Sequence, residues 1–389
     1  MRIKKDSFDN PDIEVPFFVP SLSYLDKKAV YNALNAKLLT DGPKLLEFEQ
    51  KFSSFVKSKY AIGVSNATSA LHLSLKALGI GRNDEVIVPD MTFVATANAV
   101  LLTGAKPVLT DVEKNTLNIS PKAIKSNISN RTKAIIPVHF AGKACNMTEI
   151  MKIAKAKKLY VIEDCAHAIG TKFKNRHVGN FGDFGCFSFY PTKNITTIEG
   201  GMIISQNKKL IEKVRISRNH GISRSLKDRY SKGFPWDYDI KEAGYNYRLD
   251  EIRSSLGLSQ LKQIKILNKK RQDAFRYYNK FFKKLRGVEI PNEKNLKNSA
   301  CHLYILRIKR DFPISRNELF EKLLSKGIRT TVHYKPLHKF SIYKKRGIFK
   351  KNIVNSVQLY DEIISLPLYP GITKKEQDYV VNTITNIEN

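Results

Sequence analysis

Asp164 and Lys193 are the two residues of this chain whose surroundings suggest chemistry on a bound organic group. Asp164 follows a short apolar run, residues 159–163 (LYVIE), which predicts a buried strand. A carboxylate at the end of such a strand is costly unless loop amides or a positive charge meet it. Asp164 is therefore either a loop cap or the partner of a protonated ring nitrogen, which would make that ring an electron sink.

Lys193 lies in a loop, residues 187–201 (FSFYPTKNITTIEGG), between aromatic residues and two glycines. A solvated surface lysine is one explanation of this pattern. A lysine that is desolvated, or close to another cation, has a lowered pKa and can form a Schiff base with an aldehyde. Such an amine can also carry a proton between two carbons of a bound substrate.

Three further positions could hold a flat, phosphorylated ligand. The segment 65–70 (SNATSA) precedes a predicted helix, and amides at a helix start bind phosphate, although most such turns only cap the helix. Phe93 could stack on a planar ring or belong to the core, and Ser188 could donate to the phosphate or be a strand hydroxyl. The order of these features along the chain favours the functional interpretation.

The first half of the chain alternates helices and strands. The pattern predicts helices at 66–78, 91–103 and 148–157, and strands at 85–88, 106–110, 133–140 and 159–163. Continuous apolar strands separated by helices predict an α/β fold with a mostly parallel central sheet flanked by helices. Ligands of such sheets bind beyond the carboxyl ends of the strands, where Asp111, His139 and Asp164 fall.

The second half of the chain has a different pattern. Residues 184–190 and 200–205 predict two strands joined by the loop that carries Lys193, and residues 250–284 predict a long basic helix. We expect this helix to lead into a smaller α+β domain. The division is then a large domain of residues 1–250 and a C-terminal domain of residues 251–389, with residues 1–30 able to pack on the small domain.

The charge of the chain is strongly positive. Its 389 residues include 67 Lys and Arg against 36 Asp and Glu, a net charge of +31. The excess is larger in residues 201–389, with 40 basic and 18 acidic residues, than in residues 1–200, with 27 and 18. Such a field attracts polyanions or anionic metabolites, and the scattered lysines favour a phosphorylated substrate over nucleic acid.

The sequence favours a cytoplasmic protein. No apolar stretch approaches the roughly 18 residues that span a bilayer, and the first residues do not resemble a signal peptide. The four cysteines are far apart and include no CxxC pair: Cys145, Cys165, Cys186 and Cys301. This spacing predicts no metal site and no disulfide framework.

Ten blocks of the sequence resemble, in order, those of the DegT-type sugar aminotransferases, which are fold-type I enzymes dependent on pyridoxal 5'-phosphate (PLP). The blocks extend over nearly the whole chain, from LTDGPKLLEFE (39–49) to SLPLYPGIT (365–373). They include VIEDCAHAIG (161–170), GDFGCFSFYPTKNITTIEGG (182–201) and GYNYRLDEI (244–252). The resemblance implies a fold-type I transferase, with a large domain around the central sheet and a smaller C-terminal α+β domain.

The resemblance also implies a role for each matching residue. Lys193 falls on the Schiff-base lysine and Asp164 on the partner of the ring nitrogen. The other implied cofactor contacts are His167 at the ring, Phe93 stacked on it, Ala67, Thr68 and Ser188 at the phosphate, and Asn246 at the phosphate of the other subunit. Asn246 therefore implies a homodimer with shared active sites. Arg248 is a candidate for the carboxylate of the amino donor, with a structural salt bridge as the alternative.

The implied reaction moves an amino group from an amino acid, glutamate by family analogy, to a nucleotide-linked keto sugar. The product would serve surface polysaccharide, lipopolysaccharide or glycosylated metabolites. Lys193 favours this reaction over the related sugar dehydratases, which carry histidine at that position. Three alternatives remain: such a dehydratase, a non-enzymatic regulator or nucleic-acid binder, and a PLP-dependent desulfurase or decarboxylase. Residues 223–242 and 339–356 match the family least, which leaves the sugar open.

Overall fold

An eight-stranded sheet forms the centre of the molecule in the computed structural model, which describes residues 14–223, 234–291, 296–349 and 353–388. The strand order is β1-β9-β8-β5-β4-β2-β3-β12. The strands are β1 (Tyr60–Val64), β2 (Glu85–Pro89), β3 (Lys106–Thr110), β4 (Thr132–Ile135), β5 (Tyr160–Asp164), β8 (Phe184–Ser188), β9 (Gly201–Ser205) and β12 (Ile348–Phe349). Only β9 runs against its neighbours, which confirms the predicted mostly parallel sheet.

Helices cover both faces of this sheet. Apolar residues of α3 (Ala67–Ala77), α4 (Val94–Leu102) and α7 (Lys208–Arg218) share one buried cluster with the strands. Residues of α5 (Pro121–Asn127) and α6 (Met147–Lys157) form another, and α2 (Pro43–Val56) with α9 (Glu251–Phe282) form a third. Strands buried on both faces account for the continuous apolar runs of the sequence.

One predicted strand is too long. The apolar run 133–140 predicts a strand that extends to residue 140, but β4 ends at Ile135. Pro137 has no N–H to donate to a neighbouring strand, and the chain then turns through Phe140–Gly142. His139 still contacts the next strand, because its backbone N–H donates to the carbonyl oxygen of Asp164 at 3.0 Å.

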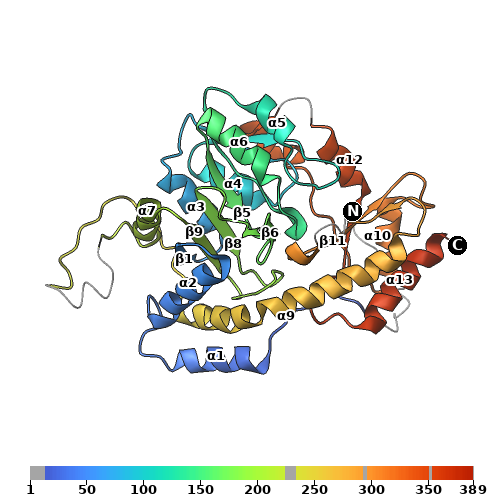
Figure 1. The fold of residues 1–389 in the computed structure, drawn as a ribbon, viewed down its shortest axis with the longest axis horizontal. Coiled ribbons are helices and arrows are strands. Elements are labelled where there is room, and N and C mark those ends of the chain that lie inside the picture. Colours follow the sequence, from blue (N-terminus) through green and yellow to red (C-terminus); the bar gives the residue numbers. More distant parts are fainter. Residues whose placement is uncertain (1–13, 224–233, 292–295, 350–352, 389) are drawn as a thin grey trace.

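The helix α9 links the central sheet to a second, smaller unit. Figure 1 shows it running from beneath the sheet to the C-terminal elements, with α1 (Tyr24–Leu34) beside its first half. The smaller unit has an antiparallel sheet of β10 (Val288–Glu289), β11 (Tyr304–Ile308) and β13 (Ile363–Leu366). It also holds α10 (Arg316–Ser325), α12 (Asn355–Glu362) and α13 (Lys374–Glu388), and its core includes residues of α9.

The chain crosses between the two units more than once. Near the N-terminus, Val15 pairs with Ile328 and lies in the core of the smaller unit. Conversely, the segment with α11 (Ser341–Arg346) and β12 returns to the large sheet, where Tyr343 is buried. The division at residue 250 therefore remains a prediction of where the chain enters the smaller unit. Residues 1–13, 224–233 and 350–352, parts of segments named above, lie outside the described residues.

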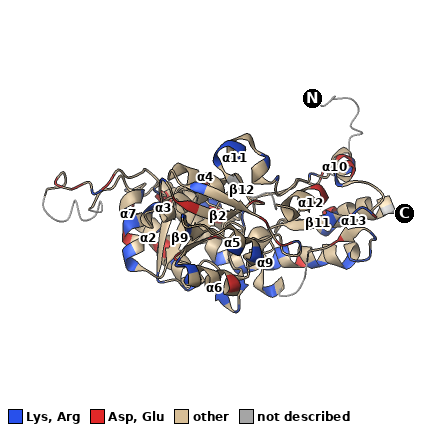
Figure 2. Cartoon of the chain, turned by 90° about the horizontal axis from the view of Figure 1, so that it is seen from above, with Lys and Arg blue, Asp and Glu red and all other residues tan. Residues whose placement is uncertain are grey.

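Two general features of the sequence can be followed in the fold. None of the described helices is both long enough and apolar enough to cross a membrane. Figure 2 shows Lys and Arg on many elements, among them α6, α9 and α11, which agrees with a charge spread along the whole sequence.

The carboxylate of Asp111 at the end of β3 connects the two units. It accepts hydrogen bonds from the backbone N–H groups of Val354, Asn355 and Ser356, at 3.1, 2.9 and 2.9 Å, and from the Ser356 hydroxyl at 3.0 Å. These are the unpaired N–H groups at the start of α12. Asp111 thus caps a helix, although its strand-end position is also typical of a ligand-binding residue.

We predict that Asp111→Ala lowers the free energy of unfolding by roughly 1–3 kcal/mol, because buried donors at the start of α12 lose their acceptor. Urea unfolding measures this difference. Asp111→Asn keeps one carbonyl oxygen and should lose less. An alanine variant as stable as the wild type would show that the cap is unimportant.

Candidate active site

A cavity of about 540 Å³ opens at the carboxyl ends of β2, β5 and β8. This is the edge at which parallel sheets bind their ligands. The structure brings seven of the nine residues with predicted roles together in its wall: Ala67, Thr68, Phe93, Asp164, His167, Ser188 and Lys193. Asn246 and Arg248 are not part of this wall.

Asp164 is a desolvated carboxylate at the end of β5, only 5% exposed. One carboxylate oxygen accepts from the backbone N–H of Ala166 at 3.1 Å, and the other accepts from the hydroxyl of Thr96 at 2.9 Å. Burial nevertheless raises the pKa of Asp164, in spite of both donors and of the positive charge of Lys193. Such a carboxylate is stabilised by a bound cation, and a protonated ring nitrogen would be one.

Lys193 lies in the loop between β8 and β9, where its backbone N–H donates to the carbonyl oxygen of Tyr190 at 2.9 Å. Burial of the amine lowers the pKa of Lys193 to about 8. Asp164 opposes this shift and Arg271 adds to it. An amine with such a pKa is partly neutral near pH 7, as a nucleophile and a proton carrier must be.

The turn at the start of α3 offers backbone N–H groups to the cavity. The side chain of Asn66 caps the helix by accepting from the N–H of Ser69 at 2.8 Å, which leaves Ala67 and Thr68 in the first turn beside the cavity. Gly201 of the neighbouring strand permits this arrangement, since a Cβ there would lie 2.6 Å from the carbonyl carbon of Asn66. A helix start of this kind binds phosphate groups.

Neutral aromatic residues form the wall beside Asp164. His167 accepts from the backbone N–H of Ala141 at 3.4 Å through Nδ1, and its Nε2 is 3.2 Å from the Tyr334 hydroxyl. Burial holds the pKa of His167 well below its usual range. Tyr334 in turn contacts the ring of Phe93, with centroids 5.9 Å apart. Phe93 itself is 55% exposed, so its face is free for a planar ligand.

Asn246 and Arg248 lie outside the wall of this cavity. Asn246 is exposed and pairs with Asn219 through the backbone. Arg248 donates to the side-chain oxygen of Asn219 at 2.6 Å and lies 3.8 Å from a carboxylate oxygen of Asp41. The ion pair with Asp41 is the kind of contact that the structural alternative for Arg248 describes. The role of Arg248 at the donor carboxylate and the role of Asn246 at the phosphate of a second subunit both remain predictions.

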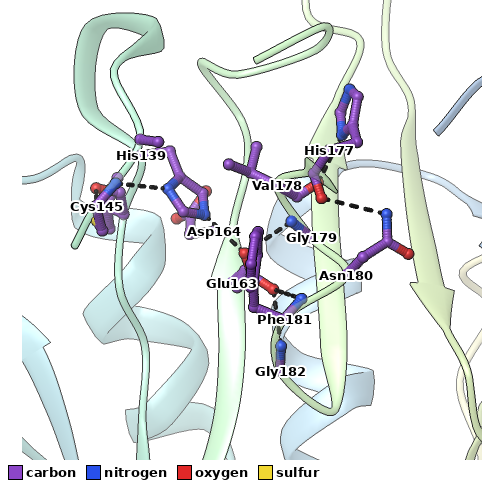
Figure 3. A network of polar contacts seen from close by, with 12 residues as sticks. His139, Cys145, Glu163, Asp164, His177, Val178, Gly179, Asn180, Phe181 and Gly182 are labelled. Atoms are coloured by element: carbon purple, nitrogen blue, oxygen red, sulfur yellow. Dashed lines mark hydrogen bonds and ion pairs between the residues drawn. The ribbon is translucent and has the colours of Figure 1, made fainter. Parts of the chain in front are cut away.

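A buried polar network lies directly below Asp164 (Figure 3). The carboxylate of Glu163 accepts from the backbone N–H groups of Gly179, Phe181 and Gly182, at 2.7, 2.6 and 2.8 Å. It also lies 2.9 Å from Nε2 of His139. Because Nδ1 of His139 accepts from the backbone of Cys145 at 3.0 Å, the neutral imidazole carries its proton on Nε2 and donates to Glu163.

The network also contains three side chains with atoms that can bind a metal ion. The ligand atoms of His139, Glu163 and Cys165 all lie within 4.8 Å of one another. Both nitrogens of His139 and both oxygens of Glu163 are already in hydrogen bonds. Burial also raises the pKa of the Cys165 thiol, which opposes the thiolate form that metals require. The arrangement fits a support for the loop before β8 rather than a metal centre.

The fold and the cavity together define an α/β enzyme with an opposed carboxylate and amine, and comparison with known proteins identifies its kind. A model of the DegT/DnrJ/EryC1/StrS aminotransferase family matches residues 20–385. The spore coat polysaccharide biosynthesis protein SpsC of Bacillus subtilis is 37% identical over 376 residues, which are 96% of this chain and 97% of that protein.

Solved structures agree with this match. Spr1654 of Streptococcus pneumoniae, in its PMP-form, has a TM-score of 0.90 and 30% identity, covering 96% of this chain and 99% of that one. PseC of Helicobacter pylori, an aminotransferase involved in the biosynthesis of pseudoaminic acid, has a TM-score of 0.87 and 32% identity, covering 97% and 99%. The chain belongs to the DegT/DnrJ/EryC1/StrS aminotransferase family and is a PLP-dependent sugar aminotransferase.

The residues of the cavity fit the chemical requirements of PLP. The phosphate needs N–H donors, the pyridine nitrogen needs an anion, and the aldehyde needs an amine of lowered pKa. The start of α3, Asp164 and Lys193 respectively offer these groups to one cavity. The buried carboxylate of Asp164 is the strongest support for PLP, because a group with such a raised pKa would be stabilised by a positively charged partner.

Sequence reasoning missed several residues of the cavity. Thr96 binds Asp164, and its position four residues after Thr92 at the start of a helix was the available signal. His333 and Tyr334 belong to VHYKPLH (332–338), a segment that resembles the family but suggested no role by itself. Their contribution follows from the return of a distant segment to the large domain, which local sequence does not reveal.

We predict that Thr96→Val weakens PLP binding by roughly tenfold or more, because a hydrogen bond to a charged group is worth about 1.5–3 kcal/mol. Absorbance titration of the apo-enzyme with PLP measures the dissociation constant. Thr96→Ser keeps the hydroxyl and should bind almost as the wild type does. Wild-type affinity in the valine variant would contradict the contribution of this donor.

Proposed function

We propose that the enzyme transfers an amino group from glutamate to a keto sugar linked to a nucleoside diphosphate, and that the product feeds surface polysaccharide synthesis. The family and the names of SpsC and PseC support this reaction class. The net charge of +31 favours an anionic substrate. The observation that carries the proposal is the pairing of Asp164 and Lys193 across one cavity.

In this proposal each predicted residue holds one part of PLP. The N–H groups of Ala67 and Thr68, with the Ser188 hydroxyl, bind the phosphate, and Phe93 covers one face of the ring. Asp164 keeps the proton on the ring nitrogen, and His167 lies beside the ring in its neutral form. When bound, PLP supplies the carbonyl that takes up the amino group and a ring that accepts electrons during the proton shift.

Lys193 has two tasks in this scheme. Its amine binds the cofactor between turnovers, and once freed by the amino donor it accepts and returns the proton that must move. With a pKa near 8, the amine is mostly charged at pH 7 but keeps a neutral fraction, so it can both release and accept a proton. The surrounding aromatic wall limits access of water to this amine.

We also propose a homodimer in which Asn246 reaches the phosphate site of the partner. Exposed large apolar residues near the cavity and on the segment 234–240 support a covered surface: Tyr190, Ile198, Phe234, Trp236 and Ile240. Figure 1 shows this segment, next to α7, extending from the body of the protein. The proposed compartment is the cytoplasm, which is supported by four buried cysteines without disulfides.

A panel of nucleotide-linked 3-keto and 4-keto sugars, incubated with PLP, enzyme and glutamate, tests the reaction. We expect one sugar to exchange its oxo group for an amine, detected by mass spectrometry, with an equal amount of 2-oxoglutarate. The Lys193→Ala variant should form neither product. A deoxygenated sugar and free ammonia would instead identify a dehydratase.

Mixed dimers test the shared site. Asn246→Ala and Lys193→Ala each damage both sites of their own homodimer. A mixed dimer should regain one intact site, because Lys193 of one subunit meets Asn246 of the other. Turnover of refolded mixtures, compared with each variant alone, measures this recovery. Mixtures no more active than the variants themselves would exclude the assignment of Asn246 to the partner's site.

A further inference from the structure

Arg271 is a positive charge buried behind the Lys193 loop. It lies in α9 and is only 1% exposed. Its guanidinium donates to the carbonyl oxygens of Leu368 at 2.8 Å, His302 at 3.2 Å and Thr192 at 3.5 Å. All these partners are uncharged, and within the part of the chain that the structure describes no carboxylate forms an ion pair with Arg271.

Burial of this cation costs free energy, so its presence in the interior requires an explanation. An arginine removed from water without a counter-ion costs several kcal/mol, by general estimates of about this size for a buried ion. Burial lowers the pKa of Arg271, but only to about 10, so the guanidinium stays charged at neutral pH. An apolar side chain could fill the same space without that cost, which suggests that the charge itself has a use.

The charge acts on a cavity that holds few other charges. Titratable groups from several elements lie around Lys193: Asp164, His167, Tyr190, Glu199, Arg271, His302, His333 and Tyr334. Burial lowers the pKa of the three histidines, that of His333 to about 3, and raises the pKa of Tyr334, so all four are neutral near pH 7. The exposed Glu199 also lines the cavity, and the two charges that change the pKa of Lys193 are Asp164 and Arg271, which act in opposite directions.

The contacts of Arg271 also hold the loop in place. Thr192, whose carbonyl oxygen accepts from Arg271, directly precedes Lys193 in the chain. The other two partners belong to segments next to β11 and β13 of the smaller unit. One side chain thus joins α9, the Lys193 loop and the smaller unit, and any displacement of it would move Lys193 relative to Asp164.

We propose that Arg271 is a positioning residue for Lys193, which fixes the loop through Thr192 and uses its buried positive charge to disfavour a second positive charge on the lysine amine. The inference rests on the proposed role of Lys193 in binding PLP. It adds to that role a cation that offsets the attraction of Asp164. Without Arg271, the attraction of Asp164 would be opposed only by the burial of the amine, and the charged form of Lys193 would be favoured more strongly.

The experiment compares the PLP-loaded wild type with Arg271→Gln, Arg271→Met and Arg271→Lys. The Gln and Met variants are neutral, and Gln keeps a donor for the carbonyl oxygens, whereas Lys keeps the charge. The readout is the pH midpoint of the visible absorbance of each holoenzyme, with circular dichroism and melting temperature as checks of folding. Two neutral variants are included because one of them could fail to fold.

Loss of the cation should raise the midpoint, because only burial then opposes protonation next to Asp164. We expect an upward shift of about one pH unit in the neutral variants, the size typical of a neighbouring charge, and a midpoint close to wild type in Arg271→Lys. A folded neutral variant with the wild-type midpoint would overturn the inference, and so would equal shifts in all three variants. A wild type without lysine-bound PLP would instead overturn the proposed function on which the inference rests.

Discussion

The opposition of a carboxylate and an amine in one poorly solvated cavity is the interaction on which the site depends. Burial acts on the two groups in opposite directions, raising the pKa of Asp164 and lowering that of Lys193 to about 8. Each group is thereby brought towards its neutral form, and a ligand with a positive ring nitrogen and an aldehyde would relieve both. The cavity is consequently prepared for one kind of cofactor before that cofactor binds.

The surrounding fold holds these two groups in the wall of the same cavity. Asp164 ends β5, and the network of Glu163 and His139 binds the loop that leads into β8, the strand from which the Lys193 loop departs (Figure 3). Arg271 holds the same loop from the other side through Thr192. Both supports are made of buried polar groups, which tolerate little displacement because a broken hydrogen bond in the interior is costly.

Sequence could predict the sheet and most of the cavity because both follow from local patterns. The apolar runs predicted the bounds of β2, β3 and β5 to within a residue or two. The position of Asp164 at the end of a strand indicated that it could bind a ligand. The same reasoning could not distinguish Asp164 from Asp111, which also ends a strand but caps α12. That difference arises from the return of residues 353–356 to the end of β3, where Ser356 and Asp111 are in contact although they lie 245 positions apart in the sequence.

Other parts of the site depend on tertiary contacts in the same way. Tyr334 reaches His167 from a segment 167 positions away, and Arg271 reaches Thr192 from the middle of a helix that sequence indicated only as long and basic. Asn246 illustrates a further limit, since its predicted role requires a second subunit. The periodicity and the motif order of a sequence describe a single chain. They do not show where a second subunit would bind.

Reduction of the PLP-loaded enzyme with borohydride, followed by peptide mapping, tests the central claim most directly. The account predicts one cofactor adduct for each chain, on the peptide that carries Lys193, and a loss of visible absorbance as it forms. An adduct on a different lysine, or a protein that retains no PLP at all, would contradict the pairing of Asp164 and Lys193 around a single cofactor.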